Sequence, residues 1–309
     1  MERSTEARRP FCSAVSSARG EPLAATASRI DHWVLMEHRG PWRRDVLGGS
    51  LLSPALKAHL REQLAALPHA RLLFVRRPER RAETGRRVVI GQSRPGDEWF
   101  VACDVEHLDD LLAVDLLAGP TGGSGPWAPL EEPLFVVCTH GKRDRCCARE
   151  GRPLYEALRR AAPRAEVWQS THVGGDRFAG NVVVLPQGLY FGRVGPEDVE
   201  PLLASLGAGE IDLHRYRGRS AYSFPVQAAE QAVRESEGLL GIGDVDVVGS
   251  RRLADDRWRV RLRTPDGAVH ELDVDATLGD EAVYLTCDSV EPRPARHHRV
   301  TGHRVRSPR

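Results

Sequence analysis

The order of the segments between residues 134 and 206 most restricts how this chain can fold. The apolar run Leu134–Cys138 predicts a buried strand, and the pattern after it predicts a helix from Cys147 to Ala162. The segments expected next are a strand at Glu166–Gln169, a hairpin of Asn181–Leu185 and Leu189–Arg193 across Pro186-Gln-Gly188, and a helix at Pro196–Leu206. This alternation predicts an α/β architecture.

Strand, helix, strand, hairpin, helix is the order of a thioredoxin-like fold, although other small α/β sandwiches share it. We expect such a domain over residues 125–215. We expect an α/β domain before it, over residues 1–124. Its expected elements are strands at His32–Glu37, Arg71–Val75, Arg87–Gly91 and Glu98–Ala102 and helices at Pro54–Leu67 and Val105–Leu117. This order also allows a degenerate thioredoxin-like domain. The breaker-rich segment Gly119–Pro126 is the expected linker.

The residues after the second domain predict a small α+β extension over 216–291. Its expected elements are a helix at Pro225–Leu240, strands at Trp258–Arg263 and Val269–Val274 around the turn Thr264-Pro-Asp-Gly267, and a strand at Val283–Cys287. Residues 292–309 hold six arginines, three histidines and three prolines with little to bury, which predicts a disordered basic tail.

Composition excludes several classes of function. The chain has 44 lysines and arginines against 43 acidic residues, so its net charge of +1 predicts no nucleic-acid partner. Apolar runs long enough for a membrane span are missing from the sequence, and Arg8, Arg9 and Pro10 interrupt any leader-like N-terminus, so we expect a cytoplasmic protein without a membrane partner. Three of the six cysteines cluster at positions 138–147, which favours metal binding or redox chemistry over a disulfide framework.

Two short stretches carry the expected chemistry. The first is Cys138-Thr-His-Gly-Lys-Arg-Asp-Arg-Cys-Cys147, and the second is Thr171-His-Val-Gly-Gly-Asp-Arg-Phe-Ala-Gly-Asn181. A cysteine that leaves a buried strand and another that enters the next helix can converge on one iron. Gly174 and Gly175 allow the second loop to bend and bring side chains 172 and 176 to a second iron. The pattern therefore suits a binuclear iron–sulfur cluster.

With these motifs the sequence resembles the sucrase/ferredoxin-like family. Further matching segments are Val184-Leu-Pro-Gln-Gly-Leu189, Cys12-Ser, Gly20-Glu, Thr26-Ala and the region from Trp33 to Trp42. The resemblance implies a thioredoxin-like [2Fe-2S] ferredoxin domain whose cluster is bound by two cysteines of the first loop and two histidines, four residues apart, in the second loop.

Carried over by position, Cys138, Cys147 and His172 match the family's ligand set, while Asp176 stands at the position of the second histidine. A carboxylate is a harder ligand than imidazole and is less suited to iron–sulfur ligation. Three alternatives follow: Asp176 is a ligand, Cys146 replaces it, or the cluster is labile or lost. Cys12, Cys103 and Cys287 are interpreted as small core residues.

The expected function is that of an electron-transfer or redox-sensing protein that exchanges electrons with a reductase or an electron acceptor. We expect a carrier rather than an enzyme and assign no catalytic residue. Sucrase activity is not expected, because no pair of carboxylates stands out. One alternative is a thiol oxidoreductase using Cys138, Cys146 or Cys147, against which the missing Cys-x-x-Cys spacing counts. The other is a non-catalytic protein with a decayed or zinc-occupied site.

Overall fold

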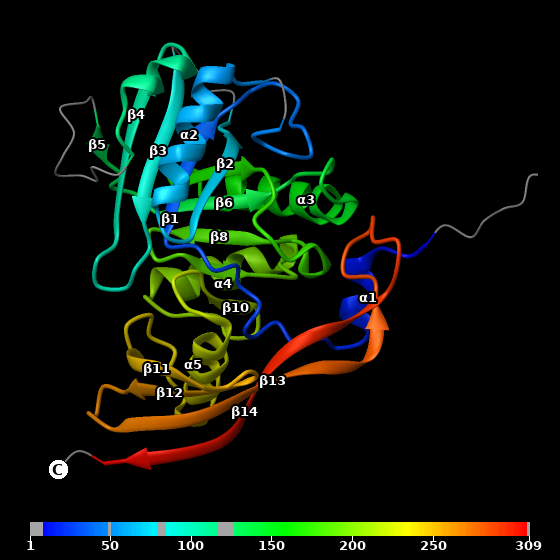
Figure 1. The fold of residues 1–309 in the computed structure, drawn as a ribbon, viewed down its shortest axis with the longest axis vertical. Helices are drawn as coiled ribbons and strands as arrows, with labels where there is room; N and C mark the ends of the chain where they lie inside the picture. Colours follow the sequence, from blue (N-terminus) through cyan, green and yellow to red (C-terminus); the bar gives the residue numbers. More distant parts are fainter. Residues whose placement is uncertain (1–8, 49–50, 79–84, 117–126, 308–309) are drawn as a thin grey trace, which may run out of the picture.

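The fold is that of a computed structural model that describes residues 9–307 apart from 49–50, 79–84 and 117–126. A ten-stranded mixed sheet forms the centre of the molecule, with the strand order β10-β9-β8-β6-β7-β2-β1-β3-β4-β5, and a separate four-stranded sheet follows it in the chain (Figure 1). No helix in the described ranges combines the length and the apolar character that crossing a bilayer requires. The large sheet divides into two similar halves.

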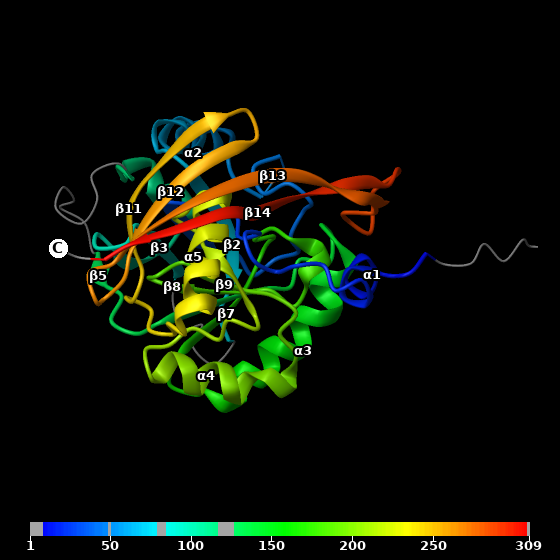
Figure 2. The same cartoon turned by 90° about the horizontal axis from the view of Figure 1, so that it is seen from below.

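The second half has the expected thioredoxin-like topology. Its elements are β6 (Leu134–Cys138), α3 (Arg145–Ala161), β7 (Glu166–Ser170), β8 (Val182–Leu185), β9 (Leu189–Phe191) and α4 (Val199–Gly207). Strand β6 pairs in parallel with β7 and antiparallel with β8, which pairs antiparallel with β9. Helices α3 and α4 lie side by side on one side of the sheet (Figure 2). The predicted fold class, α/β (α+β) with a thioredoxin-like domain, is confirmed.

The first half repeats this topology. Its elements are β1 (His32–Glu37), α2 (Pro54–Ala66), β2 (Ala70–Arg76), β3 (Arg86–Gln92) and β4 (Trp99–Val105). Strand β1 pairs in parallel with β2 and antiparallel with β3, and β3 pairs antiparallel with β4. The order β2-β1-β3-β4 is therefore equivalent to β7-β6-β8-β9. The two-residue strand β5 (Ala128–Pro129) pairs along β4.

The predicted helix over Val105–Leu117 is wrong. Val105 is buried and ends β4, and a 3-10 helix at Leu108–Ala113 is the helical part. The apolar spacing interpreted as one long helix belongs to a strand end and a short turn. Residues 117–126, which include the expected linker and the boundary at 124/125, lie outside the described residues. The domain boundaries stay a prediction.

The two halves share one sheet and one core. Strands β2 and β7 pair antiparallel through Val75↔Ser170 and Arg76↔Gln169. One buried cluster contains Trp33 and Leu73 of the first half together with Cys138, Cys147 and Trp168 of the second half. Because β2 and β7 occupy equivalent positions in their halves, the halves meet edge to edge in an approximately two-fold arrangement.

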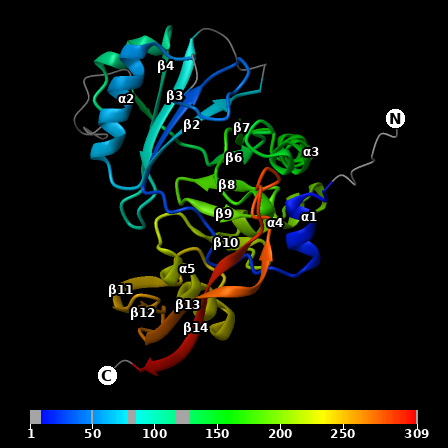
Figure 3. The same cartoon turned by 45° about the vertical axis from the view of Figure 1, so that its right-hand side comes forward.

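The residues after β10 (Tyr216–Arg219) form α5 (Phe224–Glu237) packed on an antiparallel sheet (Figure 3). Its strands are β11 (Asp246–Ala254), β12 (Arg257–Arg263), β13 (Val269–Val283) and β14 (Arg293–Arg306). The expected disordered tail over 292–309 is corrected by β14, which pairs along most of β13. Its arginines contact acidic side chains of neighbouring strands, such as Glu271 3.4 Å from Arg304.

The hairpin of β13 and β14 extends beyond the small sheet and carries its tip to α1 (Cys12–Ala18), beside the second half (Figure 1). The predicted strand Val283–Cys287 is wrong, since Val283 ends β13 and the following residues form this tip. Exposed contacts hold the tip near the N-terminal segments, including Arg44 Nη1 to Asp288 Oδ2 at 2.7 Å. Helix α1 and strands β10 and β11 had no counterpart among the sequence predictions.

Candidate metal centre

The first loop of the centre connects β6 to α3. Cys138 is the last residue of β6, and Asp144 caps α3 by accepting a hydrogen bond from the Cys146 amide at 2.8 Å. Cys147 lies in the first turn of the helix. Gly151, one turn further, lets α3 pass close to β6, because a Cβ at this position would overlap the Cys138 carbonyl oxygen. Strand end and helix start are thereby held together.

The second loop begins where β7 ends and carries His172 and Asp176. Gly174 and Gly175 have φ angles of 101° and 80°, in the left-handed region that favours glycine. This confirms that the glycines allow the tight bend expected from the sequence. The buried guanidinium of Arg217 braces the bend by donating hydrogen bonds to the Gly174 carbonyl at 3.1 Å and to Asn181 Oδ1 at 2.7 Å.

The two loops bring the four predicted ligand residues together. The ligand atoms of Cys138, Cys147 and His172 all lie within 4.8 Å of one another. Cys147 Sγ is 3.9 Å from His172 Nδ1. Asp176 lies beside these three residues, with its Oδ1 3.0 Å from His172 Nδ1 and 3.4 Å from Cys147 Sγ. Two thiols and an imidazole are therefore grouped together, and a carboxylate contacts two of these three side chains.

The pKa values of the two thiols are shifted in opposite directions. A hydrogen bond from the Cys147 thiol, together with His172, holds the pKa of Cys138 well below its ordinary value in spite of burial. The same hydrogen bond, burial and the negative charges of Cys138 and Asp176 raise the pKa of Cys147. Burial also raises the pKa of Asp176. A positive ion at this point would relieve the repulsion that keeps the second thiol protonated.

The centre is dry on its cysteine side and reaches the surface at its histidine. Cys138 and Cys147 are each 1% exposed and belong to the core shared by the two halves. The His172 side chain is 18% exposed, against 6% for Asp176. His172 is thus the predicted ligand nearest to solvent.

His140 lies in the first loop and hydrogen-bonds within it through its backbone. Its carbonyl accepts hydrogen bonds from the amides of Arg143 and Asp144, at 3.0 and 3.1 Å. The buried ring packs edge-on against Trp42, and its nitrogens make no hydrogen bond of good geometry to any described residue. The burial of the ring lowers the pKa of His140.

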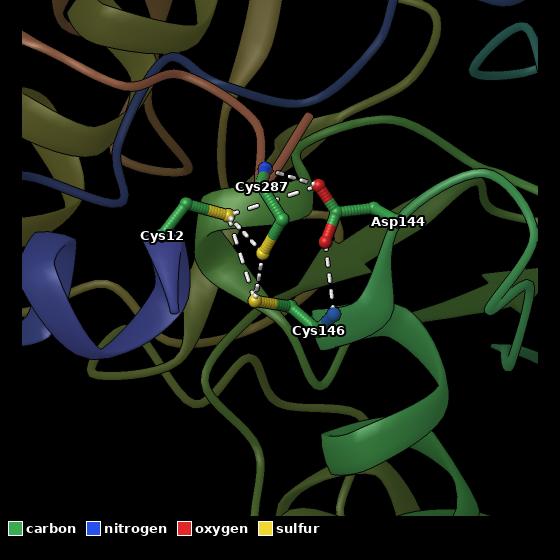
Figure 4. A group of neighbouring side chains, drawn as sticks. All are labelled: Cys12, Asp144, Cys146 and Cys287. Carbon is green, nitrogen blue, oxygen red and sulfur yellow. Dashed lines mark hydrogen bonds between the residues drawn. The ribbon is translucent and has the colours of Figure 1, made fainter. Parts of the chain in front are cut away.

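Cys146 belongs to a different group of side chains. The neighbouring side chains of Cys146 and Cys147 diverge, and Cys146 Sγ lies 3.5 Å from Cys12 Sγ and 3.2 Å from Cys287 Sγ. Figure 4 shows these three sulfurs grouped beside the carboxylate of Asp144. In this structure Cys146 therefore lies with Cys12 and Cys287, and the residue that completes the first ligand set stays a prediction.

Sequence reasoning missed this second group. Cys12 and Cys287 are buried as expected of small core residues, but their sulfurs converge on another cysteine. Cys12-Ser and Cys146-Cys147 both lie in segments that carry the family resemblance, so a signal existed for two of the three residues. Cys287 stood alone in the sequence, without a motif around it.

Several curated fungal proteins are similar to part of this chain. The "Altered inheritance of mitochondria protein 32" of Meyerozyma guilliermondii is 34% identical over 100 residues, which are 29% of this chain and 35% of that protein. The protein of the same name from Clavispora lusitaniae is 29% identical over 100 residues, 30% of this chain and 37% of its own length. The chain thus spans little more than a third of these relatives.

Among solved structures, the wild-type thioredoxin-like [2Fe-2S] ferredoxin from Aquifex aeolicus aligns with 29% of this chain and 100% of its own, at 23% identity and a TM-score of 0.26. A second structure of that ferredoxin aligns with 28% of this chain and 91% of its own, at 22% identity and the same TM-score. The profile described as Sucrase/ferredoxin-like matches residues 23–218, a range that includes both halves of the large sheet and both ligand loops. The chain therefore belongs to the sucrase/ferredoxin-like family.

Proposed function

We propose that this chain holds a [2Fe-2S] cluster between its two loops and acts as an electron-transfer or redox-sensing protein. One observation carries the proposal: two buried sulfurs and a partly exposed imidazole from separate loops lie within 4.8 Å of one another. Cys138 and Cys147 would hold one iron, and His172 and Asp176 the other. Thiolate and imidazole fit iron–sulfur ligation, whereas the carboxylate is the weakest member of the set.

The surrounding residues would tune such a centre. The cluster, when bound, supplies a reversible one-electron couple. Fewer thiolate ligands leave less negative charge at the site, which favours a higher reduction potential than four cysteines would. Arg217 adds a buried positive charge next to the second loop, and burial lowers the pKa of Arg217 to about 10. The core around Cys138 and Cys147 excludes water from the sulfur side.

A redox partner would approach the side of the centre where His172 is exposed. We propose a reductase or an electron acceptor as this partner, since electron transfer needs a short path from the surface. Nucleic acid and membrane are not proposed as partners. The cytoplasmic location expected from the sequence stays a prediction.

A second candidate is a thiol oxidoreductase, favoured by the low pKa of Cys138 and its hydrogen bond from Cys147. A thiolate beside a thiol is the arrangement that attacks disulfides. Burial of both sulfurs counts against this candidate, because a substrate disulfide must reach the attacking thiolate. A disulfide between Cys138 and Cys147 that forms and opens with added oxidant and reductant, in iron-free protein, would favour it.

Anaerobic purification tests the cluster directly. We expect a reddish-brown protein with visible absorption and about two irons and two acid-labile sulfides per chain. The variants Cys138→Ala and Cys147→Ala should each lose at least about nine-tenths of the iron, because each removes a thiolate ligand. Cys103→Ala is the matched control, since Cys103 lies in β4 and belongs to neither group of metal-binding side chains.

A colourless, iron-free preparation that also fails chemical reconstitution would refute the cluster. Zinc at about one ion per chain, bound through Cys138 and Cys147 without iron, would instead identify a zinc-occupied site. In that case Cys138→Ala and Cys147→Ala should each lose this zinc, whereas zinc bound elsewhere in the chain should remain.

A further inference from the structure

A second group of metal-binding side chains lies outside the candidate centre. Cys12 comes from α1, Cys146 from the first turn of α3, and Cys287 from the tip of the β13–β14 hairpin. The three sulfurs form a compact triangle with sides of 3.2, 3.5 and 3.6 Å, and a carboxylate oxygen of Asp144 lies within 4.8 Å of each of them (Figure 4). All three cysteines are free and buried.

We propose that Cys12, Cys146, Cys287 and Asp144 bind a single zinc ion that fastens helix α1 and the tip of the β13–β14 hairpin to the thioredoxin-like half. This site is separate from the proposed iron–sulfur centre, and neither needs the other.

The spacing of the sulfurs favours one ion over the other uses of three thiols. Ligand sulfurs about 2.3 Å from a tetrahedral zinc lie about 3.8 Å apart, close to the spacing seen here. A disulfide needs a separation of about 2.0 Å and would leave the third thiol without a role. In an iron–sulfur cluster with one cysteine on each iron, the sulfurs stand farther apart than ligands of one ion do.

Asp144 is oriented to complete the site. Its Oδ1 accepts a hydrogen bond from the Cys146 amide at 2.8 Å, and its Oδ2 accepts one from the Cys287 amide at 2.7 Å. The carboxylate therefore fixes the backbone of two of the three cysteines. Each carboxylate oxygen has a further lone pair, so Oδ2, which lies 3.9 Å from Cys12 Sγ, is available as a fourth ligand.

The surroundings suit a negatively charged ligand set. Cys146 lies in the first turn of the 17-residue helix α3, whose amino end stabilises negative charge. The side chains of Arg145 and Arg149 lie over the ring of Phe11, which packs against the same cysteine group. These positive charges would offset part of the excess negative charge of three thiolates and a carboxylate around a divalent ion.

The position of the site points to a structural role. Cys12 and Cys287 lie 275 residues apart in the sequence, and Cys146 is remote from both. Apart from this group, the polar contacts of the hairpin tip with the N-terminal segments are exposed, such as Arg9 with Ser289 and Arg44 with Asp288. Exposed contacts of this kind stabilise little, whereas a buried ion with four protein ligands is a structural site by its closed coordination.

Metal analysis of the full chain tests the proposal. In the background Cys138→Ala/Cys147→Ala, which removes the thiols of the first centre, we expect about one zinc per chain. Adding Cys12→Ala or Cys287→Ala should lower the zinc content at least about tenfold, because either change leaves two thiolates. Adding Cys103→Ala should leave it unchanged. Circular dichroism checks that each variant is folded.

A second measurement uses the unmutated chain, so it does not depend on whether a variant folds. Thiol alkylation followed by peptide mass spectrometry should find Cys12, Cys146 and Cys287 protected in zinc-loaded protein and modified at least about tenfold faster after chelation. Unchanged zinc in both the Cys12→Ala and Cys287→Ala variants would overturn the proposal. So would protein that takes up no zinc after reconstitution, or a disulfide within this trio in freshly purified protein. Iron content reports on the other centre, so either proposal can fail alone.

Discussion

Asp176 is the residue on which the properties of the proposed cluster most depend. Its carboxylate lies in contact distance of His172 and Cys147, so its position suits a ligand even though its chemistry suits iron–sulfur binding poorly. Without a metal, burial opposes its charge. The family's imidazole at this position would supply a neutral nitrogen donor instead.

The substitution Asp176→His should strengthen the cluster, since it restores the nitrogen donor of the family pattern. We expect the visible absorbance to decay at least about tenfold more slowly under chelator than in the unmutated chain. Asp176→Asn is the control, because it removes the charge without adding a nitrogen ligand, and it should decay faster. Equal decay of the histidine variant and the unmutated chain would exclude residue 176 from the coordination shell.

Gly151 is required by packing rather than by its own backbone conformation. An alanine Cβ would press on the Cys138 carbonyl oxygen, so Gly151→Ala should destabilise the chain by about 1–3 kcal/mol despite the better helix propensity of alanine. Gly207→Ala, at the end of α4 where a Cβ would meet no described atom within 4 Å, is the matched control and should be neutral or stabilising. Denaturant unfolding measures both. Equal stability of the two variants would contradict the close contact between α3 and β6.

Among the elements, β14 shows most clearly how a polar segment acquires structure from its neighbours. The segment is rich in arginine and histidine, and few of its residues are buried. It pairs with β13, where Glu271 and Asp273 accept contacts from Arg304, and its Ala295 is buried. His298 stacks on Phe224 of α5, with ring centroids 5.4 Å apart.

The burial of His298 against Phe224 predicts that the stability of the chain depends on pH. Burial, Arg296 and His297 lower the pKa of His298 to about 4, from an ordinary value of 6.5. The folded state therefore binds fewer protons than the unfolded state between these values. The free energy of unfolding is therefore not reduced by His298 above pH 6.5. It falls as the pH drops toward 4, by up to about 2 kcal/mol after allowance for the partial exposure of the ring.

His298→Phe keeps the ring contact and removes the titration. Its unfolding free energy should fall less than that of the unmutated chain between pH 7 and pH 4, in denaturant titrations at each pH. His214→Phe is the control, since His214 lies outside the small sheet, and it should follow the unmutated chain. Parallel pH profiles for the chain and His298→Phe would show that His298 does not carry the effect.

At the scale of the whole molecule, the two halves of the large sheet meet next to the second ligand loop. Thr171 donates its amide to the Phe74 carbonyl at 2.8 Å, and its hydroxyl accepts the Phe74 amide at 3.0 Å. His172 follows directly. The junction of the halves therefore helps to position a predicted ligand, although the first half contributes no cysteine to the centre.

Thr171→Val should weaken this junction, because it leaves the buried Phe74 amide without its hydroxyl acceptor. We expect a loss of about 1–3 kcal/mol in the free energy of unfolding, together with faster loss of bound iron. Thr171→Ser retains the hydroxyl and should preserve most of both properties. Denaturant unfolding and iron release measure the two effects. If Thr171→Val releases iron as slowly as the unmutated chain, the junction of the halves does not position the ligands of the centre.

The sequence by itself determined the elements and motifs whose signals are local. The run Leu134–Cys138 and the segment His32–Glu37 form strands at the predicted bounds, because a continuous apolar stretch of this length buries itself as a strand. The glycine pair in the second loop indicated its bend for the same reason, since a positive φ is a local property of glycine.

Only the tertiary structure decided which distant residues meet. The joining of β2 to β7 and the convergence of Cys12, Cys146 and Cys287 depend on partners far along the chain, up to 275 residues apart, and β14 is ordered by pairing with β13. Contacts of this kind come from packing the two halves, helix α1 and the tip of the β13–β14 hairpin against one another. A local sequence pattern indicates which side chains of a segment can be buried, whereas the tertiary structure determines which other segment covers them.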